Sequence, residues 1–206
     1  MKKLLLPLAL VAFLFGCKES GNQESKVETD ESFNKVKTAG VFVLGLDDSF
    51  PPMGFRDKEN NIVGFDIDLA TEVCARLGLQ LKTQPISWDA KEQELNTGKI
   101  DCIWNGMSVD SARAKAMNLS DAYLKNRMIF TVKDKSLASL SALAGKKIAV
   151  QNGSTAQKLL EASEAGKAAK EIVPFDDNQT ALMDLEKGGV EAVFLDEIVA
   201  KYWITT

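Results

Sequence analysis

Hydrophobic residues fall into two alternating patterns along the chain. Short, nearly continuous apolar runs such as Val41–Leu46 are typical of buried strands. Apolar residues four positions apart, such as Leu69, Val73 and Leu77, are typical of amphipathic helices. The predicted strands cover residues 41–46, 79–84, 100–104, 128–133, 147–150, 171–174 and 190–195. The predicted helices cover residues 66–77, 90–96, 111–117, 154–162, 178–187 and 196–203.

Strands and helices that alternate in this way predict an α/β protein with largely parallel sheets. The alternation of strands and helices extends to about residue 127 and begins again after the predicted strand 128–133. We therefore expect a first lobe at residues 34–127, a crossover hinge strand at 128–133 and a second lobe at 134–206.

Four polar side chains directly follow predicted strands. They are Asp47, Asn105, Gln151 and Asp196. Because ligands of α/β sheets bind beyond the carboxyl ends of the strands, these residues are expected to meet. The sequence thus predicts a single ligand cleft between two lobes.

The N-terminus has the pattern of an export signal. Two lysines precede an uncharged apolar run at residues 4–15, which is too short to span a membrane comfortably. The run ends at Leu14-Phe15-Gly16-Cys17, which resembles the lipobox of bacterial lipoproteins, where the cysteine is acylated. We expect a lipoprotein signal peptide at residues 1–16, lipidation of Cys17 and an extracytoplasmic protein anchored to the membrane.

Residues 17–33 are mostly charged or amide side chains with very few apolar ones. Such a segment cannot bury a core and is typical of a flexible tether. Its polarity also disfavours the alternative interpretation of Cys17, a buried cysteine at the end of a membrane signal anchor.

Composition narrows the possible functions. The 206 residues include 25 basic and 29 acidic ones, and removing the two lysines of the signal peptide leaves 23 against 29, a net charge of −6. No basic patch is present, so nucleic acid is not an expected partner. The chain contains no histidine, which removes the commonest general base and the commonest metal ligand. We expect neither a metal nor a cofactor.

Two cysteines remain after Cys17. Cys74 lies on or near the apolar side of a predicted helix, and Cys102 lies in a predicted strand. An exported pair could form a disulfide, although small buried hydrophobic residues are the favoured interpretation of both.

The segment Gly64–Val73 carries the most informative motif, Gly-Phe-Asp-Ile-Asp-Leu-Ala-Thr-Glu-Val. Gly64 permits a turn before a helix, and Asp66 or Asp68 is expected to cap the first amides of that helix. Together with Asp47–Pro52, the segment resembles the amino-acid-binding family of bacterial extracytoplasmic solute-binding proteins. The resemblance implies a two-lobed periplasmic-binding-protein-like fold, a monomer that captures a free amino acid and delivers it to the membrane permease of an ABC importer.

The carboxylate of an amino acid needs a cationic partner, and Arg113 is the candidate because its planar fork can donate two parallel hydrogen bonds. Ser108 and Arg113 are spaced as in the Ser/Thr-x-x-x-x-Arg segment of the family. The loop Gln151–Thr155 follows a strand and opens a helix, so its backbone amides and the hydroxyls of Ser154 and Thr155 are expected to help. The alternatives are a solvated arginine and an ordinary helix N-cap.

The ammonium group of the ligand needs a carboxylate. The resemblance assigns this role to Asp196 at a strand end, with a helix-capping aspartate as the alternative. Asn105 and Ser108 are expected to supply further acceptors, and Gly106 permits close approach of the backbone. Glu197 is expected to be a solvated neighbour.

The pocket for the ligand's side chain is expected to contain Phe50, Trp88 and Gln151, with Asp47 near its rim. The aromatic pair corresponds to positions where relatives sandwich the ligand, although either ring alone would more often be core. Phe65 is predicted to be a core residue.

Relatives in this family return from the second lobe to the first, whereas this chain stops at Thr206, so the second lobe and the return crossover are predicted to be incomplete. Two alternative functions follow. One is an enzyme on the same scaffold, such as a periplasmic dehydratase or a protein like a lytic transglycosylase, which the lack of histidine disfavours. The other is a sensor module or a truncated remnant that binds nothing.

Overall fold

The structure, a computed structural model, describes residues 31–206. The predicted signal peptide, Cys17 with its predicted lipidation, and residues 18–30 of the predicted tether lie outside this part of the chain. Residues 32–206 form one compact unit. Helix α1 (Ser32–Ala39) includes residues 32 and 33, which the sequence had assigned to the tether.

The strands are β1 (Val41–Leu46), β2 (Ser49–Phe50), β3 (Gly54–Arg56), β4 (Ile62–Val63), β5 (Gln80–Pro85), β6 (Cys102–Ile103), β7 (Met128–Val132), β8 (Lys147–Gln151), β9 (Glu171–Phe175) and β10 (Ala192–Asp196). The other α-helices are α2 (Phe65–Leu77), α3 (Lys91–Asn96), α4 (Ser111–Ala116), α5 (Thr155–Ala162), α6 (Glu164–Ala168), α7 (Asn178–Lys187) and α8 (Glu197–Thr205). Residues 31–206 also contain the short 3-10 helices η1 (Trp88–Ala90), η2 (Lys135–Leu137) and η3 (Leu140–Leu143). Every predicted strand and helix is present.

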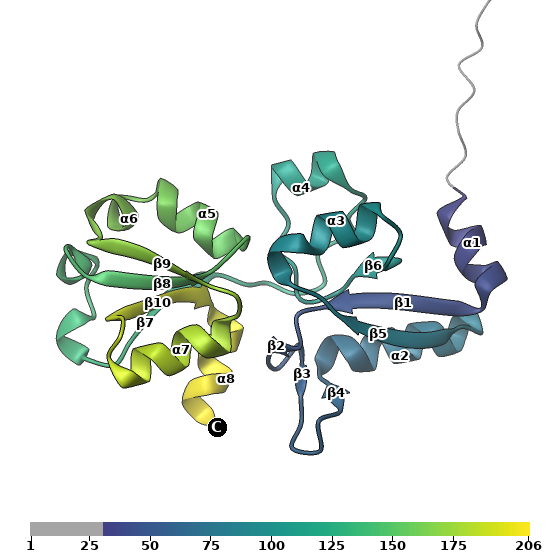
Figure 1. The fold of residues 1–206 in the computed structure, drawn as a ribbon, viewed down its shortest axis with the longest axis horizontal. Coiled ribbons are helices and arrows are strands. Elements are labelled where there is room, and N and C mark those ends of the chain that lie inside the picture. Colours follow the sequence, from purple (N-terminus) through teal and green to yellow (C-terminus); the bar gives the residue numbers. More distant parts are fainter. Residues whose placement is uncertain (1–30) are drawn as a thin grey trace, which may run out of the picture. The chain divides into compact units, whose positions relative to one another are not determined.

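Two α/β sheets organise the compact unit (Figure 1). The first has the order β5-β1-β6 and is parallel throughout, with Leu46 opposite Pro85 and Leu44 opposite Cys102. The second has the order β7-β10-β8-β9, in which only β7 runs antiparallel to its neighbour. We call residues 32–127 the first half and residues 128–206 the second half. The α/β class with largely parallel sheets is confirmed.

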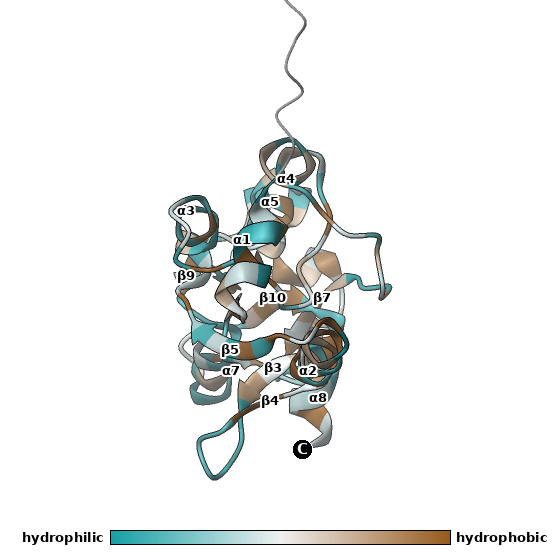
Figure 2. Cartoon of the chain, turned by 90° about the vertical axis from the view of Figure 1, so that its right-hand side faces the viewer, coloured by the Kyte–Doolittle hydropathy of each residue, from teal (hydrophilic) through white to brown (hydrophobic). Residues whose placement is uncertain are grey.

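A third, small sheet was missed by the sequence analysis. Strands β2, β3 and β4 form an antiparallel meander between β1 and α2. Each has only two or three residues, too few for a period-2 pattern to register. Figure 2 shows the turn between β3 and β4 as hydrophilic, in keeping with its run of charged and amide residues.

Alternation along the strands of the second half builds a core on both faces of its sheet. Ile148 and Val150 of β8 pack toward α5 with Leu160, whereas Ala149 packs toward α7 with Leu182. Figure 1 shows α5 and α7 on opposite faces of this sheet. A three-layer arrangement of this kind leaves the carboxyl ends of the strands for ligand contacts.

Apolar contacts also join the two halves. Phe50 and Met53 of the first half belong to one buried cluster with Leu195 of the second. The rings of Phe55 and Tyr202 lie 5.6 Å apart, so β3 packs near α8. The carboxyl ends of β1 and β10 are therefore held close to one another.

The start of α2 differs from the prediction. Gly64 occupies the N-cap position and no side chain caps the helix, so the capping role expected of Asp66 or Asp68 is wrong. Asp66 is instead fully buried. Phe65 was predicted to be core but is 43% exposed, because it begins the helix on the side away from the first sheet's core.

Cys74 and Cys102 are both free thiols, and Cys74 is buried as expected. Burial raises the pKa of the Cys102 thiol to about 11, so this group stays protonated at neutral pH. Among the described residues, no helix combines the length and apolar character that a membrane crossing requires.

Candidate functional site

A narrow cleft lies where the carboxyl ends of β1, β6, β8 and β10 meet between the halves. Its lining contains every predicted ligand-binding residue except Asp47. The lining residues are Phe50, Trp88, Asn105, Gly106, Met107, Ser108, Arg113, Met128, Gln151, Ser154, Thr155 and Asp196. Residues from both halves contribute, as the sequence analysis expected.

The cleft encloses only about 20 Å³. One water molecule needs about 10–15 Å³ of such space, so an amino acid does not fit without movement. The two halves, or the side chains between them, must separate before a ligand enters.

Arg113 lies at the centre of the cleft's polar groups. It is 2% exposed and belongs to α4, whose N-cap Asp110 accepts from the backbone amides of residues 112 and 113. Its Nη1 donates to the carbonyl oxygen of Ser108 and to Oγ1 of Thr155, both at 2.8 Å. Its Nε lies 3.7 Å from Oδ2 of Asp110. The solvated-surface interpretation of Arg113 is therefore wrong.

Asp196 ends β10 and is 8% exposed. Its side chain makes no capping bond to α8, so the capping alternative is wrong, and Oδ1 accepts instead from Nδ2 of Asn126. Burial raises the pKa of Asp196 to about 6, although the bond from Asn126 and the charge of Arg113 oppose the rise. Its neighbour Glu197 forms ion pairs with Arg127 and Lys201 instead of being merely solvated.

The loop from Gln151 to Thr155, called the 151–155 loop below, joins β8 to α5. Ser154 caps α5, since its Oγ accepts from the amide of Gln157 at 3.0 Å and donates to the carbonyl oxygen of Gln151 at 2.7 Å. The capping interpretation of Ser154 is confirmed. Thr155, in contrast, turns its hydroxyl toward Arg113 across the cleft.

Asp47 lies behind the cleft lining and not at its rim. Its Oδ2 accepts from Nε2 of Gln151 at 2.7 Å, and its Oδ1 accepts from the amide of Ser49 at 2.8 Å. Gln151 in turn accepts from Nδ2 of Asn178 at 3.0 Å. Burial is the main reason that the pKa of Asp47 is raised to about 6. A buried chain of hydrogen bonds thus crosses from β1 to α7.

Two aromatic rings, Phe50 and Trp88, are 6% and 7% exposed and both line the cleft. Gly106 has a φ of 59°, and a Cβ there would lie 3.3 Å from Cγ of Met53. Both the backbone angle and the close contact favour glycine at this position. Asn105 is 2% exposed, and its Oδ1 has no hydrogen-bond partner within residues 31–206, so this acceptor can take a donor.

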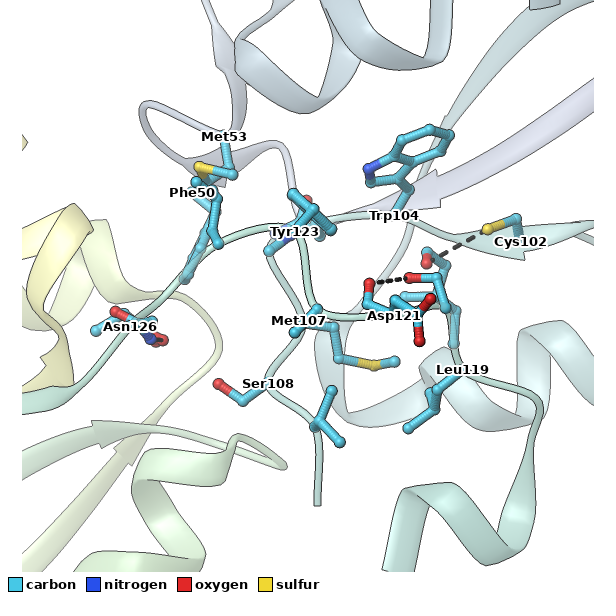
Figure 3. Close-up of a pocket in the computed structure, with 18 of the residues that line it drawn as sticks. Phe50, Met53, Cys102, Trp104, Met107, Ser108, Leu119, Asp121, Tyr123 and Asn126 are labelled. Carbon is cyan, nitrogen blue, oxygen red and sulfur yellow. Dashed lines mark hydrogen bonds between the residues drawn. The ribbon is translucent and has the colours of Figure 1, made fainter. Parts of the chain in front are cut away.

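A larger cavity of about 690 Å³ adjoins the cleft (Figure 3), and its lining comes mainly from the first half, with Asp196 and Ile198 from the second. Residues 102–109 and 117–126 supply most of its lining, and Figure 3 shows Met107, Leu119 and Tyr123 around it. The Tyr123 hydroxyl donates to Oδ1 of Asp66 at 2.9 Å and accepts from the amide of Gly106 at 3.2 Å. Burial raises the pKa of both Asp66 and Tyr123. This pair fixes the backbone of the cleft from behind.

Sequence reasoning missed several residues at the site. Lys91 is only 3% exposed and contacts the 151–155 loop, whereas lysine side chains are almost always solvated. Asn126 and Asn178 hold Asp196 and Gln151. No local motif marks them, because each acts on a residue at least 27 positions away. Within the described residues, no cluster of three or more acidic, cysteine or histidine side chains could hold a metal ion.

Comparison with known proteins gives a consistent result. The family model described as bacterial extracellular solute-binding proteins, family 3, matches residues 42–202. An ABC transporter arginine-binding protein of Escherichia coli K12 is 28% identical over all of this chain and 76% of its own length. An L-cystine-binding protein of the same strain is 26% identical over 81% of this chain and 63% of its own length. The chain thus spans about two thirds to three quarters of these relatives.

A solved structure agrees with these matches. The substrate-binding protein of an ABC uptake transporter from Streptococcus pneumoniae, solved with bound histidine, has a TM-score of 0.80 and 33% identity. The match covers 85% of this chain and 74% of that protein. Fold, cleft and sequence agree, and the family resemblance predicted from the sequence is confirmed: the chain belongs to family 3 of the bacterial extracellular solute-binding proteins.

Proposed function

We propose that the protein binds a free amino acid between its two halves and delivers it to the membrane permease of an ABC importer. One observation carries the proposal. Arg113 and Asp196 are both buried, line the same cleft and carry opposite charges, yet they form no ion pair with each other within residues 31–206. Buried charges need partners, and the two ends of a zwitterion would supply them.

In this proposal the ligand's carboxylate binds Arg113. Nη1 is engaged by Ser108 and Thr155, while Nη2 has no hydrogen-bond partner in the described part of the chain. The fixed Nη1 holds the guanidinium in place, so little rotamer entropy is lost when a carboxylate binds. The amides at the start of α5 add a favourable dipole.

The ligand's ammonium binds Asp196, whose second oxygen Oδ2 accepts no side-chain bond in residues 31–206. The unpartnered Oδ1 of Asn105 is a second acceptor. The ligand's side chain would lie between Phe50 and Trp88. Arginine, L-cystine and histidine are the first ligands to test, because the similar proteins are named for them or were solved with them.

Binding and release require the two halves to move, since the present cleft holds no more than about one water. An open form admits the amino acid, and contacts from both halves then stabilise the closed form. No covalent bond changes in this cycle. We propose that the halves correspond to lobes at residues 34–127 and 134–206, joined by 128–133.

An enzyme on the same scaffold is the competing function, and one observation favours it. Asp47 and Asp196 both have a pKa raised to about 6, and such groups are common at catalytic sites. Against it, Asp47 is engaged by Gln151 and Ser49, and the similar proteins are binding proteins.

We further propose that the protein works outside the cytoplasm as a monomer held to the membrane by a lipid on Cys17. The support comes from the sequence, where two lysines and an apolar run lead to Leu14-Phe15-Gly16-Cys17.

The test is thermal unfolding of residues 18–206 with each of the twenty amino acids and L-cystine in turn. A ligand at a hundred times its Kd adds about 2.7 kcal/mol to the free energy of unfolding. For a chain of this size that shift raises the midpoint by about 5–10 °C. A midpoint that none of these compounds moves would contradict the proposal.

A further inference from the structure

Several of the polar contacts between the two halves involve one short segment, the 151–155 loop. Four of the five residues of the 151–155 loop each contact the first half. Gln151 bonds to Asp47, Asn152 to Asp89, Gly153 to Lys91 and Thr155 to Arg113. The remaining residue, Ser154, bonds within its own half.

The contact through Lys91 is unusual because it buries a cation. Lys91 Nζ donates to the carbonyl oxygen of Trp88 at 2.9 Å, within its own half, and to that of Gly153 at 3.0 Å, across the cleft. The ammonium also lies 5.0 Å from the centre of the Trp88 ring. Burial lowers the pKa of Lys91, as does the nearby charge of Arg113. When the halves separate, the contact with Gly153 is lost while the one with Trp88 can remain.

Gly153 shows that this approach is close. Its φ is 65°, and a Cβ added there would lie 2.8 Å from Cα and 3.0 Å from Cβ of Asp89 in the first half. Backbone atoms of Asp89 cannot move aside as the end of a flexible side chain can. A glycine is therefore needed for the closed approach itself, in addition to the backbone angle.

We propose that Lys91 and Gly153 form a latch that holds the two halves closed and slows the release of the bound amino acid. The latch lies outside the ligand contacts, since neither residue lines the cleft. It is a positioning device that acts on the open–closed equilibrium, and it rests on the proposed function. A hydrogen bond to a charged group typically changes an equilibrium by about ten- to a hundredfold.

The latch is tested on the full chain by surface plasmon resonance with L-arginine, L-histidine and L-cystine. Lys91→Met keeps the length of the side chain and removes its donors, and we expect dissociation to be about tenfold faster or more. The association rate should be unchanged or higher, because a looser closed form opens more readily. Lys99→Met is the control, since Lys99 pairs with Glu94 in the same half and is 63% exposed.

Gly153→Ala tests the same latch by a steric route. Gly145→Ala is its matched control, because Gly145 also has φ near 70° and lies in the second half, but a Cβ there meets nothing within 4 Å. Both variants should lose similar thermal stability from backbone strain. Only Gly153→Ala should also release the amino acid faster.

Small-angle X-ray scattering without ligand separates the latch from the proposed function. A larger radius of gyration in Lys91→Met and Gly153→Ala than in wild type and the two controls supports the latch. If dissociation and radius match those of the controls, the latch is wrong. If wild type binds none of the three amino acids nor any other in the thermal screen, the proposed function fails, and the scattering result alone decides the latch.

Discussion

Lowering the pH from 7 to 5 is expected to weaken amino-acid binding about tenfold. The responsible group is Asp196, because burial raises its pKa to about 6. In the free protein about 9% of this carboxyl group is protonated at pH 7 and about 91% at pH 5, from its distance to the pKa. If only the carboxylate binds the ligand's ammonium, the association constant is proportional to the ionised fraction of Asp196. It therefore falls about tenfold, which weakens the binding free energy by about 1.4 kcal/mol.

The ionisation of Asp196 should affect the free energy of unfolding of the ligand-free protein in the opposite direction to its effect on affinity. Its folded pKa lies above the ordinary aspartate value of 3.8, so the native state holds the proton more tightly than the unfolded state between pH 3.8 and about 6. Rising pH through this window therefore lowers the contribution of Asp196 to stability while it raises affinity. The pKa values of Asp57, Asp110 and Asp134 are depressed, so their contribution to stability is lost only at lower pH, as the pH falls below the ordinary value of 3.8. The contribution of Asp196 to stability is therefore measured as the difference in the free energy of unfolding between wild type and Asp196→Asn at each pH.

Isothermal titration calorimetry with L-arginine between pH 5 and 7 measures the effect, because no group of this ligand titrates in that range. Asp196→Asn should bind weakly with an affinity that is nearly independent of pH. Asp47→Asn should keep the wild-type pH dependence, although the pKa of Asp47 is also raised to about 6. If the pH dependence survives in Asp196→Asn and disappears in Asp47→Asn, the assignment of the ammonium to Asp196 is refuted.

Three other changes test separate parts of the argument. Arg113→Ala should weaken amino-acid binding about a hundredfold or more, because it leaves the ligand's carboxylate without its buried partner. Arg76→Ala, at an exposed arginine, should leave binding unchanged. Equal calorimetric titration curves for the two variants would contradict the assignment of the carboxylate to Arg113. Tyr123→Phe removes the hydroxyl between Asp66 and the backbone of the cleft, and we expect urea unfolding to show a loss of about 1–3 kcal/mol; an unchanged midpoint would mean that this bond does not stabilise the loop. Cys17→Ser should move the protein from the membrane fraction to the soluble fraction after cell fractionation, and continued membrane attachment would exclude the lipid anchor.

The sequence by itself determined the order and type of the strands and helices of the two α/β sheets, but not the small β2-β3-β4 sheet. The apolar run Val41–Leu46 and the helical spacing from Leu69 to Leu77 predicted β1 and α2 because burial of one face imposes a period on the side chains. It also placed Asn105, Gln151 and Asp196 at one cleft, since parallel strands end at the same edge. These inferences succeed because they depend on neighbours a few residues apart or on a general rule of sheet topology.

Only the tertiary structure decided which polar groups pair with which. Asp47 bonds to Gln151, 104 residues away, and so leaves the rim of the pocket. Lys91 is buried because the 151–155 loop covers it, and Asp66 accepts from Tyr123 instead of capping α2. A charged residue has the same local sequence signal whether it is solvated or buried. Whether it is solvated or buried depends on the distant groups that packing brings within hydrogen-bond distance.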